Sequence, residues 1–489
     1  TDTSLGDVAD LNTLNGYTTG NVDSSTINSL TGTFSALNIA YAASSALGNG
    51  ISGLGNETVV VSDTEIITDV AALTTLNGNT TGTVNADNVA GFEASISDLN
   101  TMYAGAVSSG NGITDIGDKS VTITDTTVSD ASTLNTLNGY TSGVITADGV
   151  TALTGTASVL NTLLTAGNDT NQFSTNSFAS LATATVSDST MSIAHLNGAI
   201  AQANTATGKS TLAAGATVFS VSSGATINSG AEAAFETLLD SESKGLITLT
   251  DQNLTVDSGS ISVANAILLA ATTTGTVTAS ITTTETVDEL TTLSGTGAYT
   301  IVIRSEDATN STAAEFNTIN SATTVAIDAS EVTALASSNL SDVKTLLTAA
   351  NDTDQFTANS FSSLDDVVIA DATVDVSDFN AAVTQANTAT GQTTRDNNAT
   401  LFTLSNATAF NGGTASDFAT LLTSETNGLI SGGITTQALT VDDGTIGVSA
   451  ANDLNNTTTG VVTATITEGD MSTLASPVSY THLTLPTKR

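Results

Sequence analysis

The stretch DVADLNTLNG, from Asp7 to Gly16, contains the pattern on which the chain is built. It recurs as DVAALTTLNG at 69–78 and DASTLNTLNG at 130–139, and in looser form as TVDELTTLSG at 286–295 and TAAEFNTINS at 312–321. Each copy starts with Asp or Thr and has large apolar residues at its fifth and eighth positions. A capping acceptor followed by an i, i+3 apolar pair predicts a short helix with one buried side. We call this stretch the helix motif.

Glycine follows asparagine or serine at the end of four of the five copies, as in Asn15-Gly16. We expect this glycine to end the helix, because glycine adopts the left-handed C′ conformation at little cost. Such a short helix is not stable alone in water. The sequence therefore predicts that every helix motif packs against a larger structure.

The repeats fall into two registers. In the first part, the motif glycine recurs at intervals of 62 and 61 residues (Gly16, Gly78 and Gly139). A longer duplication follows, in which VTALTGTASVLNTLLTAGNDTNQF, ending at Phe173, returns as VTALASSNLSDVKTLLTAANDTDQF, ending at Phe356, 183 residues later. We therefore divide the chain into repeats of about 62 residues at 1–149, a duplicated block at 150–331, its truncated second copy at 332–476 and a tail at 477–489.

Runs rich in Val, Ile and Thr, such as 58–62 and 121–128, predict short strands between the helices. Strands and helices that alternate every 20 to 30 residues or so indicate parallel strands joined by crossovers, and such periods are typical of solenoids. We expect an α/β repeat solenoid, with short parallel strands stacked into an elongated sheet and short helices or turns on the opposite side, as in leucine-rich repeats. Tandem β-sandwich domains are the alternative. Since aromatic residues are 4% of the chain, we expect a core of Leu, Val, Ile and Ala.

The composition excludes several classes of protein. The formal net charge is −40, with 48 acidic and 8 basic residues, and the basic residues are scattered singly. Nucleic-acid binding needs clustered Lys and Arg, so no nucleic-acid partner is expected. Hydrophobic residues make up 39% of the chain, unlike a disordered protein, and no apolar run reaches the length of a membrane span.

Side chains suited to catalysis are scarce. His195 is the only histidine before the tail, and the corresponding position of the second copy holds Asp378. Because histidine is scarce, no Ser-His-Asp system is expected. Because cysteine is absent as well, neither a Cys-His nucleophile system nor a His/Cys metal site is expected. The adjacent carboxylates Asp365-Asp366 and Asp442-Asp443 are interpreted as solvated turn residues. We predict no catalytic residue and no required cofactor.

One polar motif occurs in both copies of the duplication, as NDTNQF and NDTDQF. Clustered Asn and Asp oxygens on a turn are ligands that Ca²⁺ accepts. The alternative is an ordinary Asx turn, with Phe173 and Phe356 as packing anchors. The candidate Ca²⁺ ligands are Asn168, Asp169, Asn351, Asp352 and Asp354.

The helix motifs and the TTGTV-like segments that follow them resemble the Thr/Asn/Asp-rich arrays of giant adhesin-like surface proteins of marine bacteria, especially cyanobacteria. The resemblance covers nearly all of 1–476, concerns the texture of the repeats and carries no catalytic residue. It implies a non-catalytic structural or adhesive segment of a large secreted or cell-surface protein, located outside the cell, with glycans or other surface proteins as partners.

Two other classes remain open as alternatives. A polysaccharide-degrading β-helix enzyme gathers basic residues and acidic metal ligands in one groove, whereas Arg304 and Arg395 are solitary here. An ice-binding solenoid needs ranked Thr-x-Thr rows, and those at 122–124 and 248–250 do not recur at one fixed position of the repeat; a calcium-binding solenoid would use the NDT turns.

The last residues differ from the rest of the chain. The only two prolines, Pro477 and Pro486, lie there together with His482. This segment resembles translated sequencing-adapter read-through, as at the ends of metagenomic contigs. We therefore expect 477–489 to be non-native and the chain to be a fragment of a longer protein.

Overall fold

The computed structural model describes residues 2–44, 50–106, 112–295, 297–304, 310–404 and 407–467. The predicted non-native tail lies outside the described residues. The chain divides into two compact units, Thr1–Asn253 and Leu254–Arg489. This division follows contacts rather than sequence similarity, so it falls inside the first copy of the duplicated block.

The N-terminal unit alternates short strands and helices. Its helices are α1 (Val8–Tyr17), α2 (Phe34–Ser44), α3 (Val70–Asn79), α4 (Ile96–Ala106), α5 (Ala131–Tyr140), α6 (Ala157–Gly167), α7 (Ile193–Thr207), the 3-10 helix η1 (Leu212–Ala214) and α8 (Glu232–Ser243). Its strands are β1 (Ser4–Leu5), β2 (Val22–Asp23), β3 (Ser29–Gly32), β4 (Ile51–Ser52), β5 (Thr58–Val61), β6 (Ile66–Ile67), β7 (Val84–Asn85), β8 (Gly91–Ala94), β9 (Ile113–Thr114), β10 (Ser120–Ile123), β11 (Thr127–Val128), β12 (Ile145–Thr146), β13 (Ala152–Gly155), β14 (Thr183–Val186), β15 (Thr190–Ser192), β16 (Val218–Val221), β17 (Thr226–Gly230) and β18 (Ile247–Thr248).

The C-terminal unit has the same alternation. Its helices are α9 (Val263–Thr272), α10 (Val287–Leu290), α12 (Ala313–Ser321), α13 (Leu340–Ala350), α14 (Val376–Thr390), the 3-10 helix η2 (Arg395–Asn397), α15 (Ala415–Thr426) and α16 (Val448–Thr457). Its strands are β19 (Asn253–Val256), β20 (Val277–Ser280), β21 (Ala298–Thr300), β22 (Ala334–Ser338), β23 (Asp366–Ile369), β24 (Thr373–Asp375), β25 (Leu401–Leu404), β26 (Ala409–Gly413), β27 (Ile430–Ser431), β28 (Ala438–Ile446) and β29 (Val462–Ile466).

Short parallel sheets run through both units. In the N-terminal unit the strand orders include β1-β3-β5-β7-β9, β6-β8-β10-β12 and β11-β13-β14-β16-β18, and in the C-terminal unit β22-β23-β25-β27 and β24-β26-β28-β29. The pairings are parallel, as in Ser29 with Thr58 and Val367 with Phe402. The α/β class with parallel strands is therefore confirmed, and no sheet closes into a barrel among the described residues. The tandem β-sandwich alternative is wrong, because such sandwiches are built from antiparallel sheets.

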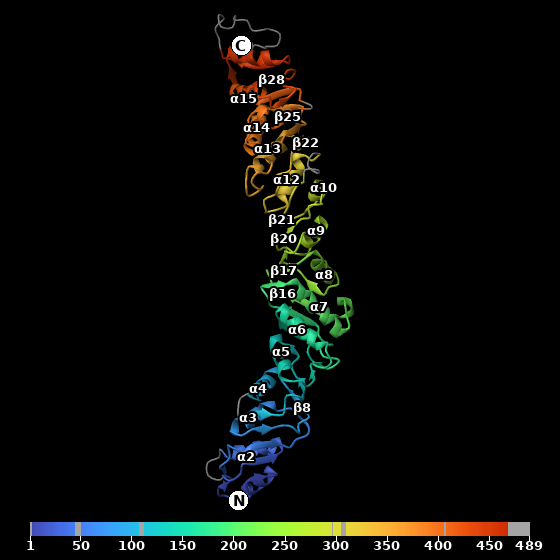
Figure 1. Ribbon diagram of the computed structural model, residues 1–489, viewed down its shortest axis with the longest axis vertical. Helices are drawn as coiled ribbons and strands as arrows, with labels where there is room; N and C mark the ends of the chain where they lie inside the picture. Colours follow the sequence, from blue (N-terminus) through green and yellow to red (C-terminus); the bar gives the residue numbers. More distant parts are fainter. Residues whose placement is uncertain are drawn as a thin grey trace, which may run out of the picture. The chain divides into compact units, whose positions relative to one another are not determined.

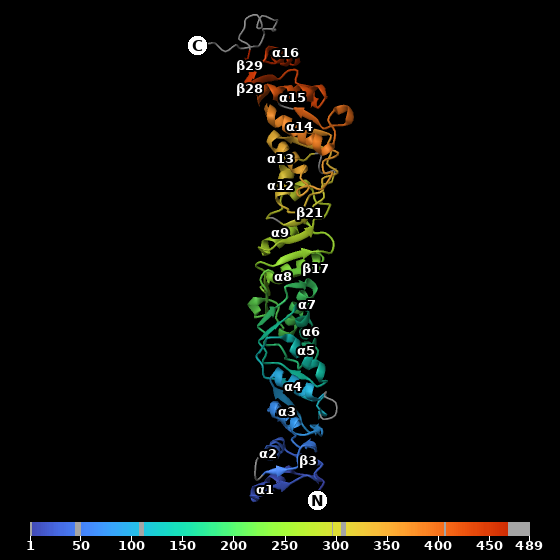
Figure 2. The same cartoon turned by 90° about the vertical axis from the view of Figure 1, so that its left-hand side faces the viewer.

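Consecutive helices pack side by side within each unit. Figure 1 shows α2 to α7 following one another in the N-terminal unit, where each contacts the next. In the C-terminal unit, α12 contacts α13 and α13 contacts α14, as Figure 2 shows from the other side. The duplication is visible in the element bounds, because α6 and α13, α7 and α14, and α8 and α15 begin 183 residues apart.

The helix motifs form helices, as predicted. The side chains of Asp7, Asp69 and Asp130 accept hydrogen bonds from the amides of Ala9, Ala72 and Ser132 and so cap α1, α3 and α5. In the looser motifs, Thr286 and Thr312 form capping boxes with the glutamates three residues later. A side-chain acceptor at position one therefore starts each of these helices.

The predicted end of the helix motif is wrong for the first three copies. Gly16, Gly78 and Gly139 lie inside the last turn, and none of them has a positive φ. Each helix continues for one further residue and is followed by a threonine with extended backbone, such as Thr141. In the looser copy at 286–295, Gly295 does have a positive φ, of 78°.

The threonine that follows the helix forms a turn with a glycine two residues later. The hydroxyl of Thr80 accepts a hydrogen bond from the amide of Gly82 and donates one to the carbonyl of Glu57, one repeat earlier. Likewise, the hydroxyl of Thr141 accepts a hydrogen bond from the amide of Gly143 and donates one to the carbonyl of Lys119. A Cβ atom at position 143 would lie 2.0 Å from the Lys119 carbonyl oxygen, so this turn requires glycine because of close approach.

Aspartates cap helices that belong to the preceding strand–helix unit. From here on, the word repeat means one such unit, which is about half of a 62-residue period. The carboxylate of Asp63 accepts a hydrogen bond from the first amide of α2, Phe34, at 2.6 Å. The first amides of the corresponding helices donate to Asp125, Asp188 and Asp371 at 2.7 Å. Because each acceptor lies 29 to 31 residues after its donor, these four aspartates hold successive repeats together.

Asparagine side chains connect neighbouring helices. Asn12, in the LN pair of the helix motif, donates to the carbonyl of Ala36 in α2 at 2.8 Å. The same bond to the first turn of the next helix is made by Asn100, Asn135, Asn197, Asn317 and Asn380. The leucine of this pair is buried, so position five supplies packing and position six supplies a lateral hydrogen bond.

The core contains more aromatic side chains than predicted. Leu73, Leu134 and their counterparts are buried, but phenylalanine pairs also fill the duplicated block, such as Phe173 with Phe178 at 5.4 Å and Phe356 with Phe361 at 5.3 Å between ring centroids. The predicted Leu, Val, Ile and Ala do fill most of the core, but the prediction left out the aromatic rings that are buried with them in addition to Phe173 and Phe356. Few aromatics in the sequence do not mean few in the core, because the apolar rings are placed inside.

Candidate functional site

The NDT turns follow α6 and α13 in the two copies of the duplication. In the first, Asn168 is the C-cap of α6, and its amide nitrogen donates to the carbonyl and the side-chain oxygen of Gln202 in α7. Asp169 accepts hydrogen bonds from the backbone and side chain of Asn171 and from the side chain of Gln172. These bonds, from the Gln172 side chain first, lower the pKa of the exposed Asp169 carboxyl.

The second turn repeats this arrangement. Asn351 donates to Gln385 of α14, and Asp352 accepts from the amide of Asp354 and the side chain of Gln355. The pKa of Asp352 is lowered for the same reason. Both turns are therefore Asx turns whose amides point to the next helix and whose aspartate closes the loop. Phe173 and Phe356 are fully buried beside them, as expected for packing anchors.

The calcium hypothesis stays a prediction. Asn168 and Asp169 belong to the N-terminal unit and Asn351, Asp352 and Asp354 to the C-terminal unit, so each NDT turn is considered as a candidate by itself. Within the described part of the chain, no three His, Asp or Glu side chains gather as a metal site would need. Any calcium ion at an NDT turn would have to use its backbone carbonyls and amide oxygens as well.

A polar groove lies on the helices of the C-terminal unit, next to the second NDT turn. It has a volume of about 570 Å³ and is lined by residues of α12, α13 and α14 together with Gln355. No local sequence pattern indicates this groove, because its lining residues come from three helices and a turn. Its polar lining residues are Asn317, Asn320, Ser321, Ser341, Lys344, Thr345, Thr348, Gln355 and Asp378, and Ala349 is apolar.

An ion pair crosses this groove from helix to helix. The Lys344 ammonium group on α13 contacts Asp378 Oδ1 on α14, with side chains 42% and 41% exposed. The carboxylate of Asp378 is held at the start of α14, whose N-cap is Asp375. Asn320 on α12 donates to Gln355 Oε1 at 2.8 Å, and Gln355 in turn donates to Asp352. Lys344, Asp378, Asn320 and Gln355 are thus held in place by contacts with neighbouring side chains.

The first copy has the same frame with different central residues. There Asn138 of α5 donates to Gln172 Oε1, also at 2.8 Å. The positions of Lys344 and Asp378 hold Asn161 and His195 instead. His195 lies on α7 and is exposed, so the prediction that it is a surface residue is confirmed.

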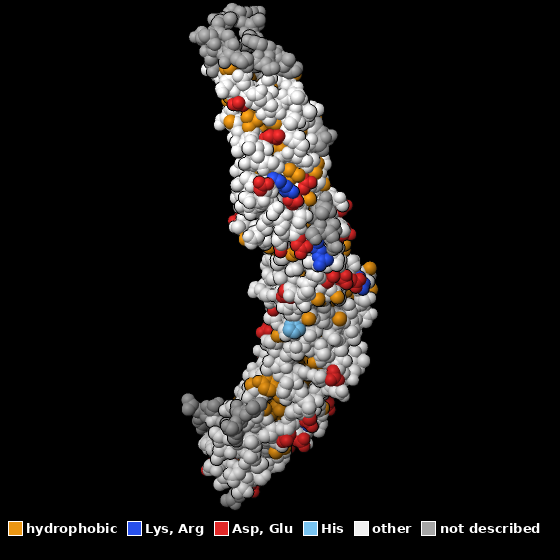
Figure 3. Space-filling view, turned by 45° about the horizontal axis from the view of Figure 1, so that its top comes forward, with side chains coloured by type: hydrophobic (Ala, Val, Ile, Leu, Met, Phe, Trp, Pro, Cys, Tyr) orange, Lys and Arg blue, Asp and Glu red, His pale blue; other side chains and the backbone are white. Residues whose placement is uncertain are grey.

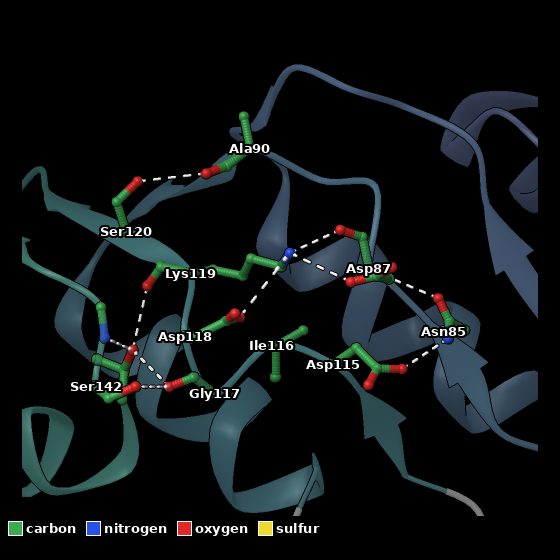
Figure 4. Close-up of polar contacts among 12 residues, drawn as sticks. Asn85, Asp87, Ala90, Asp115, Ile116, Gly117, Asp118, Lys119, Ser120 and Ser142 are labelled. Carbon is green, nitrogen blue, oxygen red and sulfur yellow. Dashed lines mark hydrogen bonds and ion pairs between the residues drawn. The ribbon is translucent and has the colours of Figure 1, made fainter.

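Another charged cluster surrounds Lys119 in the N-terminal unit (Figure 4). Its ammonium group donates to the backbone carbonyl of Asp87 at 2.6 Å and lies 3.7 and 3.9 Å from the carboxylates of Asp87 and Asp118. Asn85 donates to Asp115, which has a positive φ of 64°. Because the Lys119 side chain is only 14% exposed and fills the space between the carboxylates, the cluster ties two loops together.

Arg395 forms an ion pair in the C-terminal unit. Arg395 contacts Asp365 Oδ1 at 2.5 Å, and this hydrogen bond raises the pKa of Arg395 above its ordinary value. Figure 3 shows that most of the visible face carries neither charge nor an apolar side chain. Asp365 is exposed and precedes β23, which agrees with its interpretation as a solvated residue outside the strands. Asp366 begins β23, and the exposed Asp442 and Asp443 lie within β28, so the turn part of the interpretation is wrong for these three.

A row of hydroxyl side chains on the β11-β13-β14-β16-β18 sheet escaped the sequence analysis. Thr154, Thr185, Ser220 and Thr248 are paired in register on consecutive strands. The parallel row on the same face is interrupted by Ala152 and Val218. Irregular spacing of these strands along the chain hid the alignment from sequence comparison.

No family model matches the chain, and no curated protein matches its sequence. A search of the described helices finds none that combines the length and the apolar character needed to cross a bilayer.

Proposed function

We propose that this chain is a non-catalytic structural and adhesive repeat segment of a large secreted or cell-surface protein. Each of its two units is a solenoid segment, in which strand–helix repeats stack on one another. This proposal rests on how the chain uses its recurring polar residues.

The observation that carries the proposal is that recurring polar side chains bind the neighbouring repeat. Asp63 and its counterparts cap the helix of the repeat before, Asn12 and its counterparts bond the helix of the repeat after, and Thr80 and Thr141 hold an earlier carbonyl. A chain selected for one pocket would concentrate its polar residues there. Here the polar residues are distributed along the chain so that each repeat contacts its neighbours, as in a solenoid.

The proposed partners are glycans or other surface proteins. The exterior is acidic and rich in amides and hydroxyls, which hydrogen-bond to hydroxylated ligands without requiring a deep pocket. Weak sites distributed along a repeat array gain strength by multivalency. Of the adjacent carboxylates, Asp365 forms an ion pair with Arg395, and Asp366 and Asp442 accept hydrogen bonds from Thr403 and Gly412.

Nearest-neighbour stacking can be tested by local hydrogen exchange on the whole chain. Leu137 is fully buried in α5. Leu137→Asp buries a charge and costs several kcal/mol, so amide exchange should accelerate in α4, α5 and α6. The amides of α1 and α8 should keep their parent rates, and a loss of protection throughout the N-terminal unit would refute the solenoid.

The functional part of the proposal needs a second experiment. Antibodies against the chain should label intact cells of the source organism without permeabilisation, and the purified chain should release no reducing ends from a panel of polysaccharides. Labelling only after permeabilisation would contradict the location. Sustained release of reducing ends would contradict the non-catalytic role.

A further inference from the structure

The groove between α12, α13 and α14 combines three properties of a ligand site. It is concave, with a volume of about 570 Å³, within the usual range for small-molecule sites. Its polar groups come from three helices and one turn and converge on the same space. Lys344 and Asp378 are each about two-fifths exposed, so their charged ends are accessible from solvent.

The donors and acceptors of the groove are already oriented. Gln355 is held by Asn320 on one side and by Asp352 on the other. Asn317 is fixed by its bond to the carbonyl of Asp342, and Thr345 and Thr348 donate to carbonyls of their own helix and keep their lone pairs for a donor. Side chains held in this way lose little further conformational entropy when a ligand binds.

The chemistry of the lining selects the ligand. All the described lining residues except Ala349 carry amide, hydroxyl or charged groups, so a ligand without hydrogen-bonding groups would cover them without pairing them. Lys344 is neutralised by Asp378 in a chain of net charge −40, which disfavours an anion. A carboxylate, an ammonium group, side-chain amides and threonine hydroxyls together match a ligand whose groups both donate and accept, such as the hydroxyls of a sugar.

We propose that this groove is a binding subsite for a neutral saccharide, with Lys344 and Asp378 as its specificity-determining pair. This inference rests on the adhesive function proposed above and assigns it a place in the C-terminal unit. Because no aromatic side chain lines the described groove, the affinity of one subsite should be low, with Kd about 1 mM, or about −4 kcal/mol.

The duplication supplies matched variants for the test. K344N/D378H converts the groove to the residues of the first copy, and N161K/H195D converts the first copy to those of the second. Neutral hexasaccharides of glucose, mannose and galactose are screened against the full chain by saturation-transfer NMR, and binders are measured by calorimetry. A galacturonate hexasaccharide and inorganic sulfate form the anionic arm.

At least one neutral hexasaccharide should bind the parent chain, and K344N/D378H should weaken it about tenfold or more. N161K/H195D should add a second site of similar affinity, while N161A/H195A should leave the parent binding unchanged. Circular dichroism and thermal unfolding should be the same for parent and variants, since both residue pairs occur naturally in this frame.

Three results would overturn the proposal: no binding of any neutral hexasaccharide at about 20 mM, equal binding by K344N/D378H, or stronger binding of the anionic probes. These results would leave the adhesive-segment proposal standing, because that proposal fails on intracellular labelling or on polysaccharide cleavage instead. Weaker binding by K344N/D378H could also result from a folding defect. A gain of binding by N161K/H195D has no such explanation, so this variant separates the two causes.

Discussion

The helices α5 to α7 of the N-terminal unit and α12 to α14 of the C-terminal unit are two versions of one structure. The bond between the motif asparagine and the glutamine of the NDT turn is 2.8 Å in both, and Asp188 and Asp371 cap their helices at 2.7 Å in both. The surface between the helices differs, with Asn161 and His195 in one and Lys344 and Asp378 in the other.

This difference separates two kinds of residue. The asparagines that bond the next helix and the aspartates that cap the previous one, such as Asn135 and Asn317 or Asp188 and Asp371, have kept their type through the duplication. Changing one of them leaves an unpaired amide or carbonyl in the neighbouring repeat. Positions that face solvent on the helices have changed in charge without disturbing the frame. The comparison therefore predicts equal stability effects for equivalent frame residues and unequal binding effects for groove residues.

The largest expected effect is at the buried phenylalanines of the NDT turns. Phe173→Ala and Phe356→Ala should each lower the free energy of unfolding of their region by about 3–5 kcal/mol, because each ring is fully buried. Urea unfolding followed by circular dichroism, with hydrogen exchange to locate the change, measures this. The control is the exposed Thr353→Ala, which should stay within about 0.5 kcal/mol. A large effect in only one copy would contradict structural equivalence.

The next effect distinguishes two glycines near the end of α5, Gly139 inside the last helical turn and Gly143 in the turn that follows. Gly143→Ala should destabilise the N-terminal unit by about 1–3 kcal/mol, because its Cβ would lie 2.0 Å from the Lys119 carbonyl oxygen. Gly139→Ala, four residues earlier, meets nothing within 4 Å and has helical φ, so it should stabilise the unit by about 0.5–1 kcal/mol. Thermal unfolding of both variants tests the sign. The frame differs here, since the equivalent of Gly143 is Val325.

A smaller effect is expected from the aspartates that cap the preceding repeat. Asp188→Ala and Asp371→Ala should each cost about 0.5–2 kcal/mol, because each removes an acceptor from the first amide of a helix. The asparagine variants keep an acceptor oxygen and should lose only the charge interaction with the helix dipole. Faster amide exchange at the start of α6 and α13 is the measurement. Unchanged protection in the alanine variants would show that solvent replaces the carboxylate.

The smallest effect is acid sensitivity at the NDT turns. Hydrogen bonds lower the pKa of Asp169 and Asp352 below the ordinary value of an aspartate. Their contribution to stability is therefore present above that ordinary value and is lost as the pH falls through the folded-state pKa. Both turns should therefore loosen below about pH 4 and hold at pH 5–7. Tm measured from pH 2 to 7 should fall less steeply below pH 4 in D169N/D352N than in the parent. Identical slopes would mean that these hydrogen bonds survive protonation.

Local patterns in the sequence predicted the helix motifs and their caps. The acceptor at position one and the apolar residues at five and eight carry that information within ten residues, so no distant contact is needed to recognise it. The end of the helix was predicted wrongly. Asn15-Gly16 has the sequence of a helix C-terminus, but the helix continues through Gly16 to Tyr17. The strand β8 was also missed, since GFEA has little strand character by itself.

Packing decides whether equivalent motif residues are buried. Leu76 and Leu137 are fully buried, whereas Leu14, in the same position of the first motif, is 53% exposed. The three leucines have the same local sequence. Burial depends on which element lies alongside, and that is not encoded in the motif.

The sequence by itself determined the α/β class, the repeat registers, the helix starts and the absence of cysteine chemistry, because these depend on residue type and short-range spacing. Only the tertiary structure decided which polar side chains meet. The capping of α6 by Asp188 and the bond from Asn135 to α6 join residues 31 and 24 positions apart, and the groove around Lys344 gathers residues from Asn317 to Asp378. Their partners are fixed by how the strands pair and the helices pack, and a periodicity read along one chain does not contain that register.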